Sequence, residues 1–62
     1  MGLTQRQQEI LEYVRSFLQE NEYPPSIREI MDALRISSTS VVNYNLNALV
    51  RQGHIVRNRE LA

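Results

Sequence analysis

Apolar residues recur at helical spacing in the first third of the chain. Thr4 and Gln7 have the T-x-x-Q spacing of a capping box, in which the threonine oxygen accepts from the amide three residues later. The pattern that follows predicts an amphipathic helix of about 17 residues, ending near Asn21-Glu22. Its opposite face is polar and acidic, which is typical of a solvated surface. The predicted buried face consists of Gln7, Ile10, Leu11, Val14, Phe17, Leu18 and Asn21.

A second helix is predicted after Tyr23-Pro24-Pro25, because proline lacks an N–H and holds the residue before it extended. Ser26 and Glu29 have the S-x-x-E spacing of another capping box. The helix that they begin is about eight residues long and too short to be stable without its neighbours. Arg28 and Asp32 are expected to point outward. The predicted buried side chains are Ile27, Ile30, Met31 and Leu34.

The residues Arg35-Ile36-Ser37 form the predicted turn between the second helix and a third. A turn of three or four residues is typical of a helix-turn-helix. Ile36, its one apolar residue, is expected to fill the angle between the helices. Such turns usually carry a glycine in left-handed conformation, and Arg35 occupies that place, which costs about 1 kcal/mol. Two explanations stay open: tolerance of the strain, which we favour, and a phosphate contact by the guanidinium.

The third helix is predicted to begin after Ser38, or Ser37, as N-cap and to end before Gly53, a left-handed residue. Its apolar stripe consists of Val42, Leu46, Leu49 and Val50, and Asn45 lies beside it, nearest the core. The opposite stripe consists of Ser40, Tyr44, Asn47 and Arg51. Hydroxyl, amide and guanidinium groups without a carboxylate suit base edges and phosphates in a major groove. We therefore interpret this helix as a recognition helix.

The last residues predict the start of a β-hairpin. His54-Ile55-Val56-Arg57 alternates like a short strand, Asn58-Arg59 is typical of a turn, and Glu60-Leu61-Ala62 would begin the return strand. The alternative is a frayed tail, because a single strand is unstable alone. The whole order predicts a mainly α fold with a small β-hairpin. It corresponds to one three-helix winged helix-turn-helix domain over residues 1–62, with the helix-turn-helix at about 27–47 and a truncated wing from 54.

Composition narrows the class of function. The chain has 62 residues, no cysteine and one histidine, so we expect one small domain without disulfides, metal ion or cofactor. It shows no nucleophile–base pair, no clustered ligands and no glycine-rich phosphate loop, so no catalytic residue is assigned. Without a long apolar run or a basic leader, the chain is expected to be cytoplasmic and not bound to a membrane.

Charge is unevenly distributed, although the net charge is +0. Residues 1–32 hold three arginines and six acidic residues, whereas residues 33–62 hold four arginines and one glutamate. All seven cations are arginines, whose planar guanidinium suits phosphate and guanine. A GC-rich genome explains the arginines equally well. The basic half nevertheless contains the predicted recognition helix and hairpin.

Candidate DNA contacts follow from the outer side of the third helix. Ser40, Asn43 and Asn47 are expected to hydrogen-bond to base edges, and Val41 to touch a thymine methyl group. Tyr44 is expected to reach a base or a phosphate; the alternative is a ring packed against the second helix, which its position opposite the apolar stripe disfavours. The residues predicted to contact the DNA backbone are Arg28, Thr39, Arg51, His54, Arg57 and Arg59.

The chain resembles the N-terminal DNA-binding domain of the LexA repressor family. The resemblance is carried by L-T-x-R-Q-Q-E-I-L at 3–11, Y-P-P-S-I-R-E-I at 23–30, S-S-x-S at 37–40 and L-x-x-L-x-x-x-G-x-I at 46–55. The first two stretches are specific, whereas the last is found in many winged-helix repressors. The resemblance implies backbone contacts near Arg51, Gln52, Gly53 and the wing. It implies base-reading positions at Ser38, Ser40, Val41, Asn43 and Tyr44.

The same resemblance implies a bacterial transcriptional repressor of DNA-damage (SOS) response genes, located at the nucleoid. In this family the third helix lies in the major groove and the wing touches the backbone or the minor groove. Dimers bind a palindromic operator in double-stranded DNA. The homodimer involves a C-terminal domain that cleaves itself with a serine and a lysine. That domain is missing here, and this chain has no lysine, so it is not expected to be an enzyme.

The alternative from another class is a winged-helix module that binds proteins and not DNA. The zero net charge and the acidic first helix favour it. The outer side of the third helix disfavours it, because binding hot spots in protein interfaces are rich in large aromatic and other anchoring side chains. Sequence-specific binding of duplex DNA is therefore the leading hypothesis.

Overall fold

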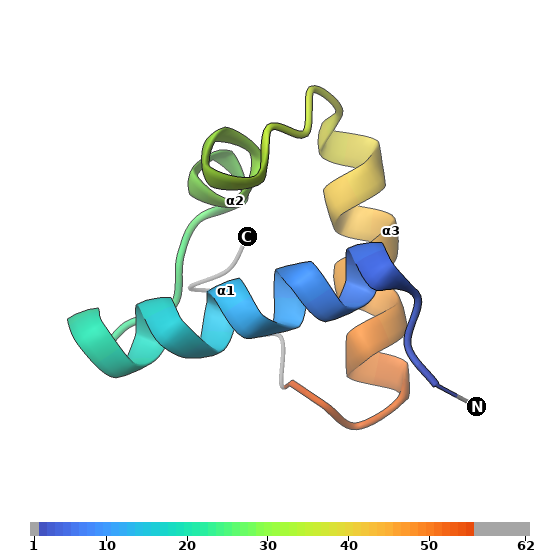
Figure 1. The fold of residues 1–62 in the computed structure, drawn as a ribbon, viewed down its shortest axis with the longest axis horizontal. Coiled ribbons are helices and arrows are strands. Elements are labelled where there is room, and N and C mark those ends of the chain that lie inside the picture. Colours follow the sequence, from blue (N-terminus) through green and yellow to red (C-terminus); the bar gives the residue numbers. More distant parts are fainter. Residues whose placement is uncertain (1, 56–62) are drawn as a thin grey trace.

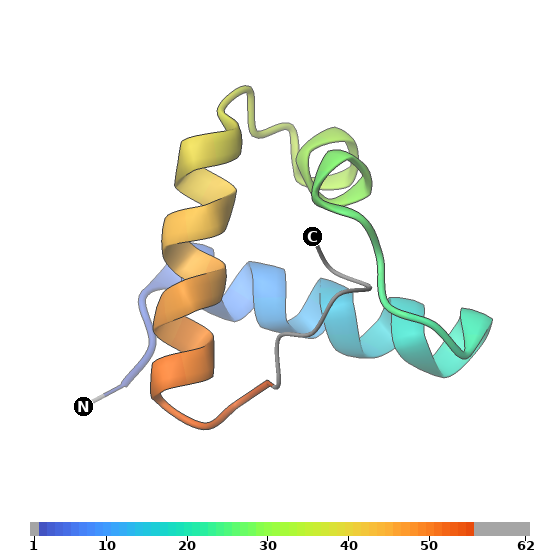
Figure 2. The ribbon, with the colours of Figure 1, turned by 180° about the vertical axis from the view of Figure 1, so that it is seen from behind.

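The computed structural model describes residues 2–55, which form three α-helices around one core (Figure 1). They are α1 (Gln5–Asn21), α2 (Ile27–Leu34) and α3 (Thr39–Arg51). α1 crosses α3 at a steep angle, and α2 packs against both (Figures 1 and 2). The predicted order of three helices, with a short turn between the second and the third, is confirmed.

α1 begins where the sequence predicts. The N–H of Gln7 donates to Thr4 Oγ1 at 3.1 Å, and the N–H of Thr4 donates to Gln7 Oε1 at 3.2 Å, so both halves of the capping box are formed. The helix has 17 residues. It ends at Asn21, and Glu22 follows in left-handed conformation with φ 64°. Both predicted ends of this helix are confirmed.

α2 and the turn after it also follow the sequence. The N–H of Glu29 donates to Ser26 Oγ at 3.1 Å, and the N–H of Ser26 donates to Glu29 Oε1 at 2.9 Å. The helix has 8 residues, and Arg35 follows it in left-handed conformation with φ 58°. The N–H of Ile36 donates to the carbonyl oxygen of Met31 at 2.9 Å, and its side chain is buried. Arg35 thus occupies the glycine-like place, and Ile36 fills the angle, as predicted.

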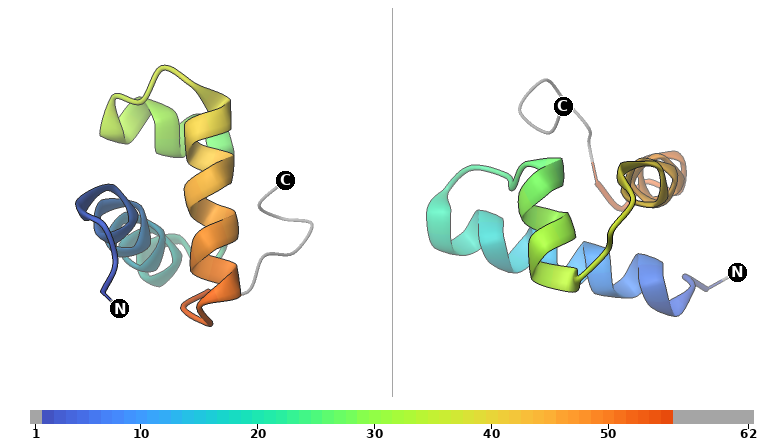
Figure 3. Two further views of the ribbon diagram at one scale, coloured as in Figure 1. Left: turned by 90° about the vertical axis from the view of Figure 1, so that its right-hand side faces the viewer. Right: turned by 90° about the horizontal axis from the view of Figure 1, so that it is seen from above.

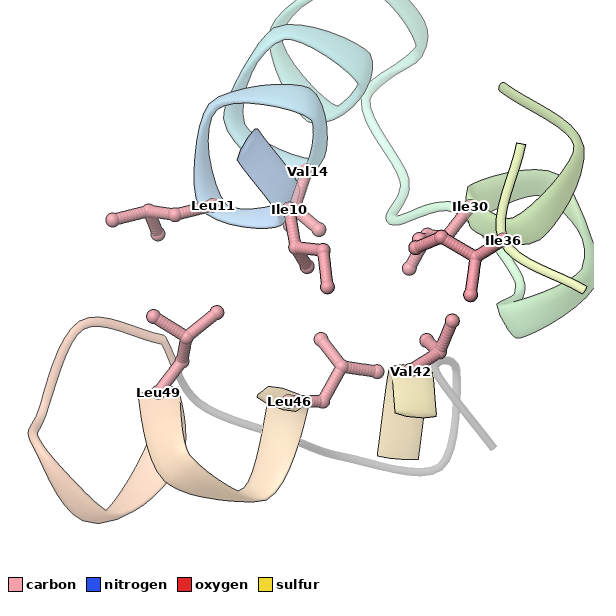
Figure 4. Close-up of a cluster of buried hydrophobic side chains, with 8 residues drawn as sticks. All are labelled: Ile10, Leu11, Val14, Ile30, Ile36, Val42, Leu46 and Leu49. Atoms are coloured by element: carbon pink, nitrogen blue, oxygen red, sulfur yellow. The ribbon is translucent and has the colours of Figure 1, made fainter. Parts of the chain in front are cut away.

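The core combines side chains from all three helices and the turn. In Figure 4, side chains of α1 face those of α3, and Ile30 and Ile36 close one end of the cluster. Burying one aliphatic side chain stabilises a fold by about 1.5–3 kcal/mol, so this cluster fixes α3 against α1 and α2. Val50 is only half-buried. The buried residues of the cluster are Ile10, Leu11, Val14, Ile30, Ile36, Val42, Leu46 and Leu49.

The buried face of α1 is shorter than its periodicity predicts. Leu18 is 46% exposed and Asn21 is exposed, because the last turn of α1 projects beyond the helices that cover the rest of it (Figure 1). Phe17 is half-buried in a row of aromatic rings. Its ring centroid lies 5.9 Å from that of Tyr13 and 5.5 Å from that of Tyr23. This row packs the loop after α1 against the helix.

Residues 2–55 contain no β-strand. The sequence predicts a strand from His54, but the N–H of His54 donates to the carbonyl oxygen of Leu49 and so belongs to the turn that ends α3. Ile55 is half-buried against the core and is not in a strand either. The predicted start of the wing at residue 54 is therefore corrected. The rest of the predicted hairpin, residues 56–62, lies outside the described residues.

Candidate nucleic-acid interface

The outer face of α3 is an exposed helical surface with DNA-binding chemistry. α3 stands at one side of the molecule and turns this face away from α1 and α2 (Figure 3). Tyr44 is 67% exposed, which excludes the alternative of a ring packed against α2. Val42 and Leu46, on the opposite side of the helix, are fully buried. The exposed stripe is the predicted one, Ser40, Tyr44, Asn47 and Arg51.

Several side chains of this face have no partner within residues 2–55. In the part of the chain that the structure describes, Ser40, Tyr44 and Arg51 make no side-chain hydrogen bond or ion pair. α3 contains no acidic residue. Val41 is 41% exposed and adds an apolar surface beside these groups. The face therefore offers donors, acceptors and a methyl-bearing surface, and no carboxylate that would repel phosphate.

The N-terminal end of α3 favours an anion. Ser38 is the N-cap, and its Oγ accepts the N–H of Val41 at 3.4 Å, so Ser38 and not Ser37 begins the helix. Thr39 and Ser40 follow in the first turn and are exposed. No acidic residue lies in this turn. The positive end of the helix dipole is therefore not neutralised there, and a phosphate group would be attracted to it.

The C-terminal end of α3 is a Schellman motif. The N–H of Gly53 donates to the carbonyl oxygen of Val50, and the N–H of His54 donates to that of Leu49, both at 3.0 Å. Gly53 has φ 81°, which confirms it as the left-handed residue after the helix. Gln52, Gly53 and His54 are all exposed. The backbone contacts predicted for this end are therefore accessible to a ligand.

The three asparagines of α3 differ in position. Asn45 is 7% exposed, and its Nδ2 donates to the carbonyl oxygen of Val41 at 2.8 Å. This bond within the helix gives Asn45 a structural role, in agreement with its predicted place nearest the core. Asn43 is half-buried on the flank, and Asn47 is exposed. Asn43 and Asn47 are therefore the candidate base-reading amides.

A shallow hollow of about 360 Å³ joins α2 to the start of α3. Arg28 of α2 and Thr39 of α3 both line it, so the fold brings together two predicted backbone contacts from separate helices. Ile27 and Met31 contribute its apolar part, and Asp32 also lines it. Sequence reasoning assigned no function to Asp32. The sequence feature that could have pointed to Asp32 is its place in the last turn of a helix, where the helix dipole disfavours an acidic residue.

Charge interactions within residues 2–55 lie away from the outer face of α3. Burial raises the pKa of the Tyr13 phenol, and the carboxylates of Glu29 and Asp32 raise it further. The one ion pair of this region joins Arg6 to Glu9 at 3.0 Å, within α1. The interactions of these acidic residues thus lie within α1 and between α1 and α2, and α3 itself carries no acidic residue.

Residues 2–55 hold no group of three or more His, Cys, Asp or Glu side chains that could bind a metal ion. None of the three described helices is long and apolar enough to span a bilayer. Arg57 and Arg59, two of the predicted phosphate contacts, lie outside the described residues.

Three helices with a tight turn before an exposed, carboxylate-free third helix define a domain of the helix-turn-helix class. Residues 1–61 match the family model of the LexA DNA binding domain. The chain belongs to this family.

Curated relatives agree with the family match. A protein of a Roseiflexus species named LexA repressor is 62% identical over 55 residues, and one of Herpetosiphon aurantiacus is 57% identical over 56 residues. The LexA repressor of Sorangium cellulosum is 48% identical over 56 residues. These alignments cover 89–90% of this chain but 24–26% of the relatives. The chain therefore spans about a quarter of their length. No solved structure matches it.

Proposed function

We propose that this chain binds double-stranded DNA sequence-specifically, as the operator-reading domain of a LexA-like repressor of DNA-damage (SOS) response genes. It would act at the nucleoid, in the bacterial cytoplasm. The observation that carries the proposal is the outer face of α3, where Ser40, Tyr44 and Arg51 are exposed, unpaired within residues 2–55 and accompanied by no acidic residue. Membership of the LexA DNA-binding domain family supports it.

In this proposal α3 enters the major groove, which is about 12 Å wide and admits a helix. Asn43 and Asn47 hydrogen-bond to base edges, with adenine the best geometric partner of an asparagine. Ser38 and Ser40 contact bases near the N-terminal end of the helix. The side chains that complete the base-reading set are Val41, against a thymine methyl group, and Tyr44.

Two groups of backbone contacts flank the reading face. At one end, Arg28 and Thr39 line the hollow between α2 and α3. At the other end, Arg51, Gln52, Gly53 and His54 are exposed around the Schellman motif. The 13 residues of α3 separate these ends by about 20 Å, at 1.5 Å per residue, which allows contacts to phosphates on both sides of a groove. Further phosphate contacts would come from Arg57 and Arg59, and from the wing that would contain them.

A palindromic operator read by two copies completes the proposal. Each copy would bind one half-site, so the symmetry of the operator would mirror that of a homodimer. The homodimer would depend on a C-terminal domain that these 62 residues do not include, where the self-cleaving serine and lysine of the family would also lie. The length of the curated relatives, about four times the aligned region, is consistent with such a domain.

The test is selection from a pool of random duplexes, followed by fluorescence anisotropy with the enriched duplex and a scrambled duplex of equal composition. We expect one enriched motif and tighter binding to it. The logarithm of the affinity should fall with the logarithm of the salt concentration with a slope of about −2 to −4 for a single domain. Absence of binding to any duplex at about 50 mM salt would overturn the proposal and favour a protein-binding module.

A further inference from the structure

We infer that Asp32 limits the affinity of this chain for the DNA backbone, because this acidic residue lines the same hollow as Arg28 and Thr39. The inference rests on the proposed function, since it concerns the phosphate contacts of the DNA complex. It assigns to one acidic residue of α2 a role in setting how tightly a single domain holds duplex DNA.

The placement of the three side chains gives the first argument. Arg28 and Asp32 are four residues apart on α2 and therefore lie on the same side of the helix. Both are exposed, and Thr39, in the first turn of α3, lines the same hollow. A phosphate that is attracted by the Arg28 guanidinium and by the amides at the start of α3 must then approach the Asp32 carboxylate. Its repulsion opposes part of the attraction.

The lack of a structural role for this carboxylate gives the second argument. Within residues 2–55, Asp32 makes no hydrogen bond or ion pair, not even with Arg28. Aspartate is a poor helix former, and in the last turn of α2 its charge opposes the helix dipole. Local preferences therefore disfavour an acid here, and no contact compensates for it. Such a conflict between local preference and sequence is typical of a functional position.

Weak binding by one domain has a consequence for a repressor. If each domain alone binds weakly, occupancy of a site depends on two linked domains binding together, because linkage raises the effective concentration of the second. Separation of the pair then releases the DNA. The carboxylate of Asp32, beside the hollow between α2 and α3, would keep the affinity of the single domain weak.

The experiment compares Asp32→Asn with Glu20→Gln in the 62-residue chain. Each variant removes one negative charge and keeps the size of the side chain. Glu20 is an exposed residue in the last turn of α1, and that end of α1 lies away from α3 (Figure 1). Anisotropy with the selected duplex at about 50 mM salt should show Asp32→Asn binding about three- to tenfold tighter than the wild type. Glu20→Gln should change the affinity less than about twofold.

Two further measurements separate the possible outcomes. The gain of Asp32→Asn should shrink at about 200 mM salt, because salt screens exposed charges. The Tm of Asp32→Asn should equal or exceed that of the wild type. Three outcomes would each overturn the inference and leave the proposed function standing. In the first, the wild type binds but Asp32→Asn binds no tighter. In the others, Glu20→Gln gains equally, or Asp32→Asn has a lower Tm. Failure of every variant to bind would overturn both.

Discussion

The outer faces of α1 and α3 belong to helices that share one core, but their outward polar groups differ in charge and in some of their partners. On α1, Arg6 pairs with Glu9 at 3.0 Å, and the Nε2 of Gln8 donates to Glu12 at 2.8 Å. These groups satisfy one another along the helix, as i,i+3 and i,i+4 neighbours commonly do. The outer face of α1 also carries exposed carboxylates, which would repel phosphate.

On α3 three of the outward polar groups are not paired in this way. Ser40, Tyr44 and Arg51 are exposed and make no side-chain hydrogen bond or ion pair within residues 2–55. Amphipathicity alone thus does not distinguish a binding helix from a solvated one, since both helices have it. What distinguishes them is the charge of their outward groups, because α1 carries carboxylates and α3 carries none.

The strongest test of the shared core compares two leucines that the periodicity alone treats alike. Leu46→Ala removes a fully buried side chain of α3 and should destabilise the fold by about 2–5 kcal/mol. Leu18→Ala removes a side chain of α1 that is 46% exposed and should cost less than about 1 kcal/mol. Urea unfolding followed by circular dichroism measures both. Equal losses would show that the last turn of α1 is part of the core.

The next test puts a carboxylate on each outer face. Ser40→Glu should weaken duplex binding by about 2–3 kcal/mol, because the new charge faces the DNA phosphates. The fold should not be weakened, since an acid in the first turn of α3 favours the helix dipole. Ser16→Glu, on the exposed face of α1, should change binding by less than about 0.5 kcal/mol. Anisotropy at low salt measures both, and equal losses would mean that net charge alone matters.

Helix ends could be predicted because capping is local chemistry. The Thr4–Gln7 and Ser26–Glu29 boxes each depend on residues three apart, and all four of their hydrogen bonds are formed. Gly53 ends α3 for a similar local reason, its tolerance of positive φ. The exposed stripe of α3 follows from the helical period once its apolar side is known. None of these features requires knowledge of how the helices cross.

Features that depend on the crossing of helices could not be predicted. Leu18 keeps the helical period of the buried residues, but no other helix reaches the end of α1 to cover it. The hollow that joins Arg28, Asp32 and Thr39 exists only because the core sets the angle between α2 and α3. The sequence pattern places Asp32 and Arg28 on one side of α2, but it does not reveal that Thr39 of α3 lies beside them.

A finer test separates base reading from backbone binding on α3. Asn43→Ala should weaken binding to the selected duplex by about 1–3 kcal/mol and relax the preference at one base pair. Arg51→Ala should weaken binding to selected and scrambled duplexes alike and reduce the salt slope by about 1. Anisotropy with both duplexes at several salt concentrations measures this. Equal, sequence-independent losses in both variants would contradict the division of roles.

The smallest expected effect concerns the two left-handed residues that end α1 and α2. Glu22 and Arg35 have φ 64° and 58°, a conformation that costs a non-glycine residue about 1 kcal/mol. Glu22→Gly and Arg35→Gly should each raise the free energy of unfolding by up to about 1 kcal/mol, since glycine adopts this conformation without strain. Urea unfolding measures that gain. Duplex binding then distinguishes the two explanations for Arg35. If the strain is merely tolerated, Arg35→Gly should bind with an affinity within about twofold of the wild type. If the guanidinium contacts a phosphate, Arg35→Gly should show a clear, salt-dependent loss of affinity that Glu22→Gly does not show.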